Sequence, residues 1–264
     1  MSSELNHQIS HSSWIPDSPT TIILIHGAFA SSTWWDLVIP HLSGYHILAP
    51  NLPGHGQSSE KEFSIQNATT TITQLIRSHA KDSHAHIVGH SLGARVAIHI
   101  AETNPSLVDS VFISGYGSLP QTALTPYIPY AVWMTQRLEN LVPRSVIRWA
   151  MDGTDIPRID TRLSTLRLCQ SVMAPTETKG PKPWNARTCI IVAGKGGIVP
   201  SADSRSAAVR LLEIGKLGNK STVAFWHPDM RHPWIRQDPG LFADSVKAWI
   251  EGRELPHGFE MIVS

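Results

Sequence analysis

Short runs of apolar and β-branched residues alternate along much of the chain with stretches that carry an apolar residue every three or four positions. Such runs are typical of strands buried on both faces, and the periodic stretches are typical of helices that cover a sheet. The expected strands span residues 21–25, 45–49, 86–88, 108–113, 189–193 and 222–226, and residues 5–16 are a candidate edge strand. The expected covering helices span residues 34–42, 65–79, 92–103, 204–212 and 239–250. The sequence therefore predicts an α/β domain with a mostly parallel, doubly covered sheet.

The alternation of strand and helix breaks after Gly115. Residues 117–185 lack a convincing strand and close with a proline-rich linker. The helical patterns within them span residues 130–141, 145–151 and 161–173. We interpret this segment as a helical cap inserted into a core made of residues 1–116 and 186–264, which suits a chain of 264 residues.

Composition and charge narrow the classes of function. Hydrophobic residues at 41%, charged residues at 16% and a net charge of +1 describe an ordinary globular protein, with no argument for nucleic acid or an anionic membrane as a partner. The two cysteines, Cys169 and Cys189, do not make a disulfide framework. The first residues do not read as a secretion signal, and no apolar run is long enough to span a bilayer. We expect a cytoplasmic monomer or homodimer.

The sequence Ile-Val-Gly-His-Ser-Leu-Gly-Ala at residues 87–94 places Ser91 between a β-prone run and a helical pattern. A serine at a sharp strand-to-helix turn needs small neighbours, and Gly89 and Gly93 meet that need. The helix that opens after Ser91 aims backbone N–H groups at developing negative charge. Ser91 is therefore a candidate nucleophile, although a serine that only caps the helix has the same position.

Four motifs in this order resemble those of the α/β-hydrolase-fold superfamily, of the capped serine hydrolase type, and the resemblance covers residues 20–249. They are His-Gly-Ala-Phe at residues 26–29, Leu-Pro-Gly-His-Gly-Gln-Ser at 52–58, Gly-His-Ser-Leu-Gly at 89–93 and Met-Arg-His-Pro at 230–233. The resemblance implies that Ser91 attacks a carbonyl with a histidine as its base. It implies neither a cofactor nor a metal.

The resemblance further implies the base and the oxyanion hole. His232, in the loop after the last parallel strand, fits the family signature better than His227, which lies nearer the strand end. We expect most of the 14 histidines, including His90 in the elbow, to be structural or exposed. The oxyanion donors implied are the backbone N–H groups of Leu92 and Ala28, with Phe29 as an alternative to Ala28.

The catalytic acid is where the sequence departs from the family pattern. Gly197 stands where the family carries its usual carboxylate, and no carboxylate follows the strand at residues 108–113. Asp203 is interpreted more simply as a residue at a helix N-terminus, whereas Asp229 is near enough in sequence to orient His232, although no pattern requires it. A displaced aspartate, a cap residue or an ordered water as the partner of His232, and a Ser–His dyad without an acid, are the alternatives. Asn51 is a second departure, because relatives commonly carry Asp there.

Aromatic residues suggest where an apolar substrate binds. Phe29 follows the oxyanion loop, and Trp133 belongs to the aromatic and methionine side chains of the cap. These side chains can form an apolar ceiling over a substrate, or they can simply pack the cap onto the sheet.

The sequence leaves three functions open. The first is a serine hydrolase that acts on a small, largely apolar ester, thioester or lactone. The second, motivated by Gly197, is a biosynthetic lyase, isomerase or cyclase on the same scaffold with His232 as general base. The third is a catalytically silent protein whose pocket binds a small ligand.

Overall fold

A single eight-stranded sheet organises the chain, and the strand order is β1-β3-β2-β4-β5-β6-β7-β8. The computed structural model describes residues 10–117, 122–174, 180–196 and 203–263. The central pairs from β3 to β7 are parallel, whereas β1 and β8 pair antiparallel at the two edges. The strands are β1 (His11–Trp14), β2 (Thr21–Ile25), β3 (His46–Pro50), β4 (Ala85–His90), β5 (Val108–Ser114), β6 (Thr188–Ala193), β7 (Val223–His227) and β8 (Glu260–Met261). The expected α/β class and mostly parallel sheet are confirmed.

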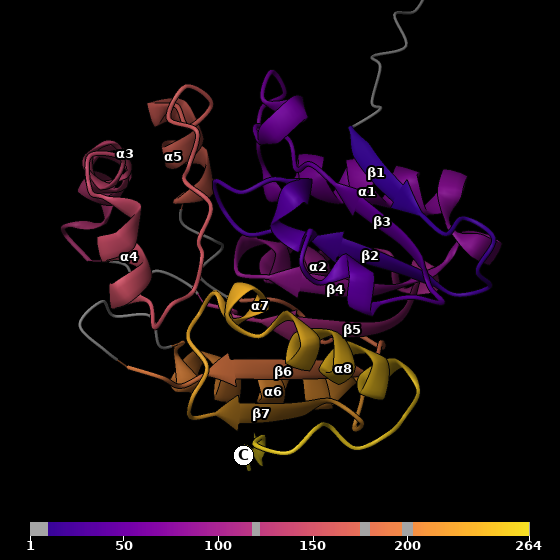
Figure 1. Cartoon of the computed structure of the whole chain (residues 1–264). Coiled ribbons are helices and arrows are strands. Elements are labelled where there is room, and N and C mark those ends of the chain that lie inside the picture. Colours follow the sequence, from indigo (N-terminus) through magenta and orange to yellow (C-terminus); the bar gives the residue numbers. More distant parts are fainter. Residues whose placement is uncertain (1–9, 118–121, 175–179, 197–202, 264) are drawn as a thin grey trace, which may run out of the picture.

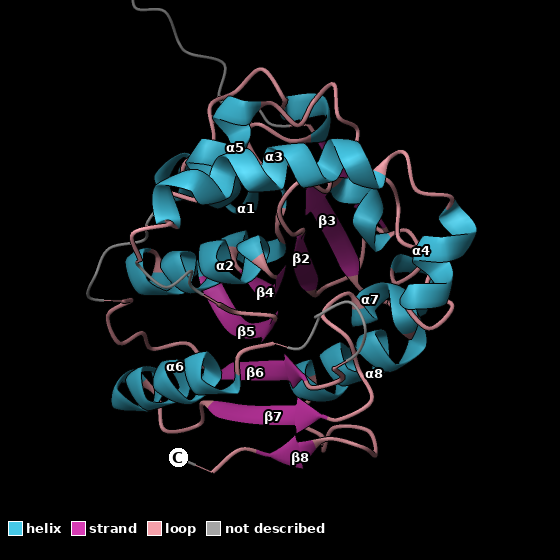
Figure 2. Ribbon diagram, turned by 90° about the vertical axis from the view of Figure 1, so that its left-hand side faces the viewer, coloured by secondary structure: helices cyan, strands magenta, loops and turns pink. Residues whose placement is uncertain are grey.

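Helices cover both faces of the sheet, as Figure 2 shows for α6 and α8 on either side of β6 and β7. Alternate residues of β2 serve the two faces: Ile23 and Ile25 pack among residues of α1, α2 and α6, and Ile22 and Leu24 pack among residues of α7 and α8. This division explains why the strand reads as a continuous apolar run. The helices are α1 (Ile65–His79), α2 (Leu92–Thr103), α3 (Ile128–Glu139), α4 (Arg144–Ala150), α5 (Leu166–Val172), α6 (Arg205–Gly218), α7 (Trp234–Gln237) and α8 (Pro239–Ile250).

Two of the expected helices differ in type or length from the structure. The expected helix at residues 34–42 is a pair of 3-10 turns, Ser32–Trp35 and Ile39–His41. Pro40 removes a backbone donor there, while Val38 and Leu42 are still fully buried. The expected helix at residues 161–173 is only α5, because Thr165 caps a helix that starts at Leu166.

The helices α3, α4 and α5, which we call the cap helices, lie together beside the carboxyl ends of the strands (Figure 1). The described part of residues 117–185 contains no strand. This arrangement agrees with an inserted cap, whose boundaries at residues 117 and 185 stay a prediction.

Three histidines are buried where the loops leave the carboxyl edge of the sheet. They are His26 after β2, His55 after β3, and His90 at the end of β4. Burial is the main cause that lowers their pKa values from about 6.5 to about 3, about 4 and about 3, respectively. All three are therefore neutral imidazoles near neutral pH.

The aromatic cluster under α8 provides a test of packing. Phe242 is fully buried, and its ring centroid lies 4.7 Å from that of Trp234, 5.6 Å from Trp35 and 5.7 Å from Phe112. We expect Phe242→Ala to lower the free energy of unfolding by about 3–5 kcal/mol, because it removes a ring from a closely packed cluster. Urea unfolding measures this loss. Leu217→Ala, at a side chain that is 79% exposed, is the control and should stay within about 0.5 kcal/mol of wild type.

The buried histidines predict how stability changes with pH. Their folded-state pKa values lie below the ordinary value, so the unfolded chain binds more protons between pH 4 and 6.5. The free energy of unfolding should therefore fall as the pH is lowered through this window, by up to about 1.4 kcal/mol per pH unit for each group. Urea unfolding at pH 7, 6 and 5 gives the slope. His26→Gln, which keeps an acceptor for the Leu52 N–H, should flatten the slope, and an unchanged slope would contradict this origin.

Candidate active site

Ser91 lies in a sharp turn between β4 and α2, with the strained dihedral angles φ 54° and ψ −113°. A Cβ atom on Gly89 would come within 2.5 Å of the Gly93 carbonyl oxygen, and one on Gly93 within 2.1 Å of the Ile25 carbonyl oxygen. The two glycines therefore let α2 pass directly against β2 and β4. Strain of this kind is concentrated at functional sites, and here it presents the serine side chain at the edge of the sheet.

His232 is hydrogen-bonded to a carboxylate. Its Nδ1 lies 2.5 Å from Oδ1 of Asp203, whose side chain is only 4% exposed. The other carboxylate oxygen accepts the N–H of Ala193 at 2.9 Å, and the Asp203 N–H donates to the Ala193 carbonyl oxygen at 2.8 Å. Asp203 is thus fastened to the end of β6. It sets the tautomer of His232 that carries a proton on Nδ1 and leaves Nε2 free to accept one.

The sequence interpretation of Asp203 is corrected by this geometry. The helix α6 begins at Arg205 and is capped by Ser204, whose side chain accepts the Ala207 N–H, so Asp203 lies outside the helix. Its carboxylate serves His232 and the end of β6 instead of the helix dipole. Gly197, where the acid was expected, lies outside the described residues. Asp203 is the first carboxylate after the expected position in the sequence. A search that allowed the loop length to vary would therefore have identified it as the partner of His232.

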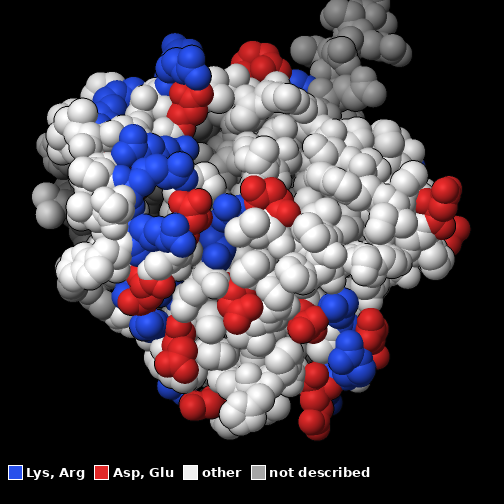
Figure 3. All heavy atoms as spheres, viewed as in Figure 1, with Lys and Arg blue, Asp and Glu red and all other residues white. Residues whose placement is uncertain are grey.

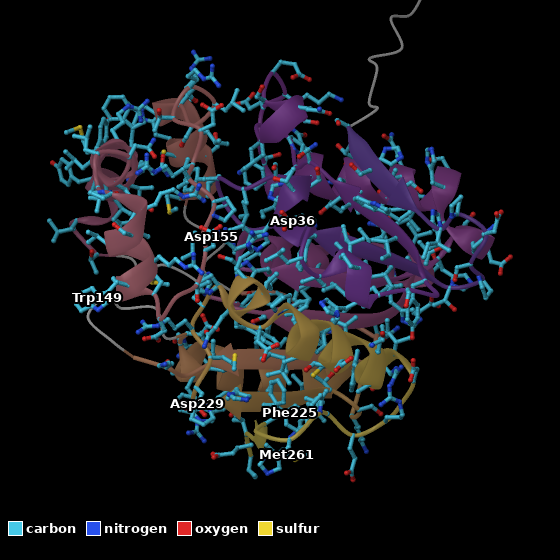
Figure 4. The ribbon with its side chains drawn as sticks, viewed as in Figure 1. Asp36, Trp149, Asp155, Phe225, Asp229 and Met261 are labelled. Atoms are coloured by element: carbon cyan, nitrogen blue, oxygen red, sulfur yellow. The ribbon has the colours of Figure 1, made fainter. Side chains whose placement is uncertain are left out.

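Asp229, the other candidate acid, is an exposed residue beside β7 and is labelled in Figure 4. Its backbone carbonyl accepts from the Gln237 side chain, and its backbone N–H lies 3.3 Å from His227 Nδ1. Its described hydrogen bonds therefore shape the loop that carries His232. His227, the alternative base, lies with its ring against Phe259 at 4.9 Å, away from the residues that line the site.

A cavity of about 570 Å³ brings Ser91 and His232 together at the carboxyl edge of the sheet. Ala28 and Phe29, from the loop after β2, line it as well. The cap side of the wall is formed by Glu139, Ile156, Pro157, Arg158, Ile159, Asp160, Leu163, Ser164 and Leu168. The cavity therefore lies between the sheet edge and the cap, and its wall mixes apolar and polar side chains.

The remaining predicted site residues fall in two places. Leu92 is the first residue of α2, where a backbone N–H has no acceptor within the helix and can serve an anion. Trp133 is not among the described residues that line the cavity. Its ring lies 3.8 Å from the guanidinium of Arg137, so it packs within the cap helices. Sequence reasoning missed the wall residues 156–160, because they have no helical or strand periodicity. Leu163, which was expected in the helix at residues 161–173, lies in a turn and also lines the wall.

Charged side chains join the cap side to the loops that carry the site. Asp152, which follows α4, accepts from Arg231 Nε and from Lys195 Nζ, both at 2.7 Å, and these partners lower its pKa to about 2. Arg236 of α7 pairs with Asp36 and donates to the backbone oxygen of Asp155; both aspartates are labelled in Figure 4. In the space-filling view of Figure 3, basic side chains gather over the cap with acidic ones among them.

The described ranges of the chain contain neither a metal-ligand cluster nor a membrane-spanning helix. No group of three or more histidine, cysteine or acidic side chains is placed there to hold a metal ion. No helix in those ranges is long and apolar enough to cross a bilayer. Cys169 and Cys189 are buried free thiols.

Comparisons with known proteins identify the family of the chain. The family model described as the alpha/beta hydrolase family matches residues 22–245. An AB hydrolase superfamily protein of Gibberella zeae is 35% identical over 246 residues, which cover 92% of this chain and 84% of that protein. A putative 2-succinyl-6-hydroxy-2,4-cyclohexadiene-1-carboxylate synthase of Haemophilus influenzae is 33% identical over 81 residues, 30% of this chain and 33% of that protein.

A solved structure of a lipase-esterase related protein from Clostridium acetobutylicum has the same fold, with a TM-score of 0.66 over 91% of this chain and 98% of that one. At 15% identity this likeness concerns the fold alone. The family model and the relative in Gibberella zeae, which both extend over most of the chain, decide the assignment. The chain belongs to the alpha/beta hydrolase family.

Proposed function

We propose that the protein is a cofactor-independent serine hydrolase that cleaves an ester, thioester or lactone of a small substrate with an apolar part. The observation that carries this proposal is the hydrogen bond of 2.5 Å between His232 Nδ1 and Asp203, beside a cavity that Ser91 also lines. A histidine oriented in this way can take the proton of a serine hydroxyl and hold it as an imidazolium next to a carboxylate.

In the proposed mechanism, Ser91 Oγ attacks the substrate carbonyl while His232 Nε2 takes the hydroxyl proton. The backbone N–H groups of Leu92 and Ala28 donate to the oxyanion of the tetrahedral intermediate. The intermediate collapses, the leaving alcohol or thiol receives the proton from His232, and an acyl-serine remains. Water then attacks the acyl group with His232 as its base, which releases the acid and restores the Ser91 hydroxyl.

The cavity supports the choice of a substrate with an apolar part. Phe29, Ile156 and Ile159 supply apolar surface near Ser91, whereas Glu139 and Arg158 supply charged groups on the cap side. A volume of about 570 Å³ suits a small molecule. We therefore propose Phe29 as a substrate contact, and we assign the substrate contacts from the cap to residues 156–160 and Leu163 in place of Trp133.

Replacement of the nucleophile tests the proposal directly. We expect Ser91→Ala to lower the turnover of p-nitrophenyl acetate and butyrate by a factor of about 10³–10⁶, because it removes the oxygen that attacks the substrate carbonyl. A fluorophosphonate should label the wild-type protein at Ser91, as peptide mass spectrometry would show, and should not label Ser91→Ala. A wild-type protein that neither labels nor turns over esters would contradict the proposal and favour a silent binding protein.

Asp203 can be tested against a matched aspartate in the neighbouring loop. We expect Asp203→Asn to lower kcat by about 10⁴, because an amide that donates to Nδ1 favours the wrong tautomer of His232. Asp229→Asn should keep kcat within a few-fold, since the described hydrogen bonds of Asp229 involve its backbone. Ester hydrolysis near the wild-type rate in Asp203→Asn would show that this carboxylate does not support the base.

A non-hydrolytic reaction on the same scaffold is the second candidate. The sequence analysis suggested this candidate because Gly197 replaces the usual carboxylate. Asp203 contacts His232 instead, so Gly197 is no longer an argument for a non-hydrolytic reaction. The observation that still favours it is the similarity over 81 residues to a protein named as a putative carboxylate synthase. Labelling of Ser91 by a fluorophosphonate without turnover of any ester would support this candidate over hydrolysis.

A further inference from the structure

His90, the residue before the proposed nucleophile, has a structural connection to the loop of the proposed base. It is the last residue of β4, is only 2% exposed, and lines the cavity. Its Nε2 lies 2.9 Å from the backbone carbonyl oxygen of His232, which is 142 positions away in the chain. A carbonyl oxygen only accepts, so His90 donates through a proton on Nε2.

The protonation state of His90 is therefore defined by its surroundings. Burial, followed by the proximity of His232, lowers its pKa to about 3, so the imidazole is neutral at physiological pH. With its proton on Nε2, Nδ1 is a bare acceptor, and this atom is buried without a partner among the described residues. A neutral donor suits this position, because a cation here would repel the imidazolium that forms on His232.

The ring of His90 is also held from both neighbours. The indole of Trp34 stacks on it with ring centroids 5.8 Å apart and planes at 18°. The imidazole of His232 lies on it at 4.7 Å and 46°. Trp34 thus limits rotation of the His90 ring, which keeps its N–H directed at the carbonyl of His232.

Two further contacts locate the His232 side chain. A Cβ atom on Gly115 would come within 2.5 Å of His232 Cε1, so the imidazole lies directly against the backbone at the end of β5. Asp203 holds Nδ1 at 2.5 Å. These contacts orient the ring, whereas the bond from His90 holds the backbone of the same residue.

We propose that His90 is a positioning residue. Its side chain holds the backbone of the proposed base His232, and its own backbone continues into the proposed nucleophile Ser91. This inference rests on the proposed function. Because His90 and Ser91 share a peptide bond, the hydrogen bond to the His232 carbonyl sets the separation of Ser91 Oγ and His232 Nε2. A misplacement of about 1 Å between such groups can cost about 10²-fold in rate. The loss of this single hydrogen bond is therefore enough to lower the catalytic rate measurably.

The test compares two substitutions of nearly equal shape. His90→Gln keeps an N–H near the position of Nε2, and His90→Met removes it. We expect His90→Met to lower kcat for p-nitrophenyl acetate and the rate of fluorophosphonate labelling by about 10–100-fold, with KM within about twofold. His90→Gln should recover most of the lost rate. His86→Gln, on the same strand with its Nδ1 at the Ser110 hydroxyl, is the control and should match wild type.

Several outcomes would overturn the inference. One is a kcat of His90→Met equal to that of wild type. Another is an equal loss of kcat in His90→Met and His90→Gln when the two variants have the same melting temperature. Nitrogen-15 NMR of the wild-type protein is independent of how the variants fold. The spectra should show His90 neutral and protonated on Nε2 from pH 5 to 8, and the other tautomer, or titration near pH 6.5, would contradict the proposal. Wild-type protein that neither labels nor turns over ester refutes the proposed function instead.

Discussion

The hydrogen bond between Asp203 and His232 is the interaction on which the site depends, and the order of the strands makes it possible. Asp203 follows β6 and His232 follows β7, and these strands are parallel neighbours with Ala193 opposite His227. Backbone bonds continue the pairing beyond the strands, from the Gly194 N–H to the His227 oxygen at 2.9 Å and from the Lys195 N–H to the Met230 oxygen at 2.8 Å. The two loops therefore leave the sheet together, and a carboxylate on one reaches an imidazole on the other.

Periodicity predicted the elements of the sheet but could not predict this contact. The runs at residues 21–25 and 189–193 are recognisable as strands in the sequence, because both faces of each strand are covered and every residue is buried. The loop between β6 and α6 has no period, and the position of its carboxylate depends on where the chain folds back to Ala193. The family pattern has a fixed spacing and predicts the carboxylate at position 197. The fold requires only that some carboxylate in this loop lies close to the end of β6, as Asp203 does.

The same distinction explains the substrate residues. Phe29 belongs to a motif directly after β2, so its place at the sheet edge follows from the strand, and it lines the cavity. Trp133 belongs to α3, whose orientation depends on packing against α5, and its ring lies on Arg137 instead. Residues 156–160 reach the cavity from an irregular segment, which no pattern of apolar positions identifies. Motifs anchored to strands were thus predictable, and residues carried by the cap helices and their connections were not.

The cap side also contacts the loops beside the cavity, because Asp152 accepts hydrogen bonds from both loops that carry the proposed base and its carboxylate partner. Arg231 is covalently joined to His232, and Lys195 lies near the start of the loop that ends at Asp203. A shift of Asp152 relative to either loop costs a charge-assisted hydrogen bond, so the position of the cap side and the geometry of the base are linked. The hydrogen bond from His90 to the His232 carbonyl is a separate contact with the backbone of the residue that follows Arg231. The proposed base is consequently held through Asp203, His90 and Asp152. Movement of the cap side acts on it through Asp152, directly by way of Arg231 and indirectly by way of Lys195 in the loop that ends at Asp203.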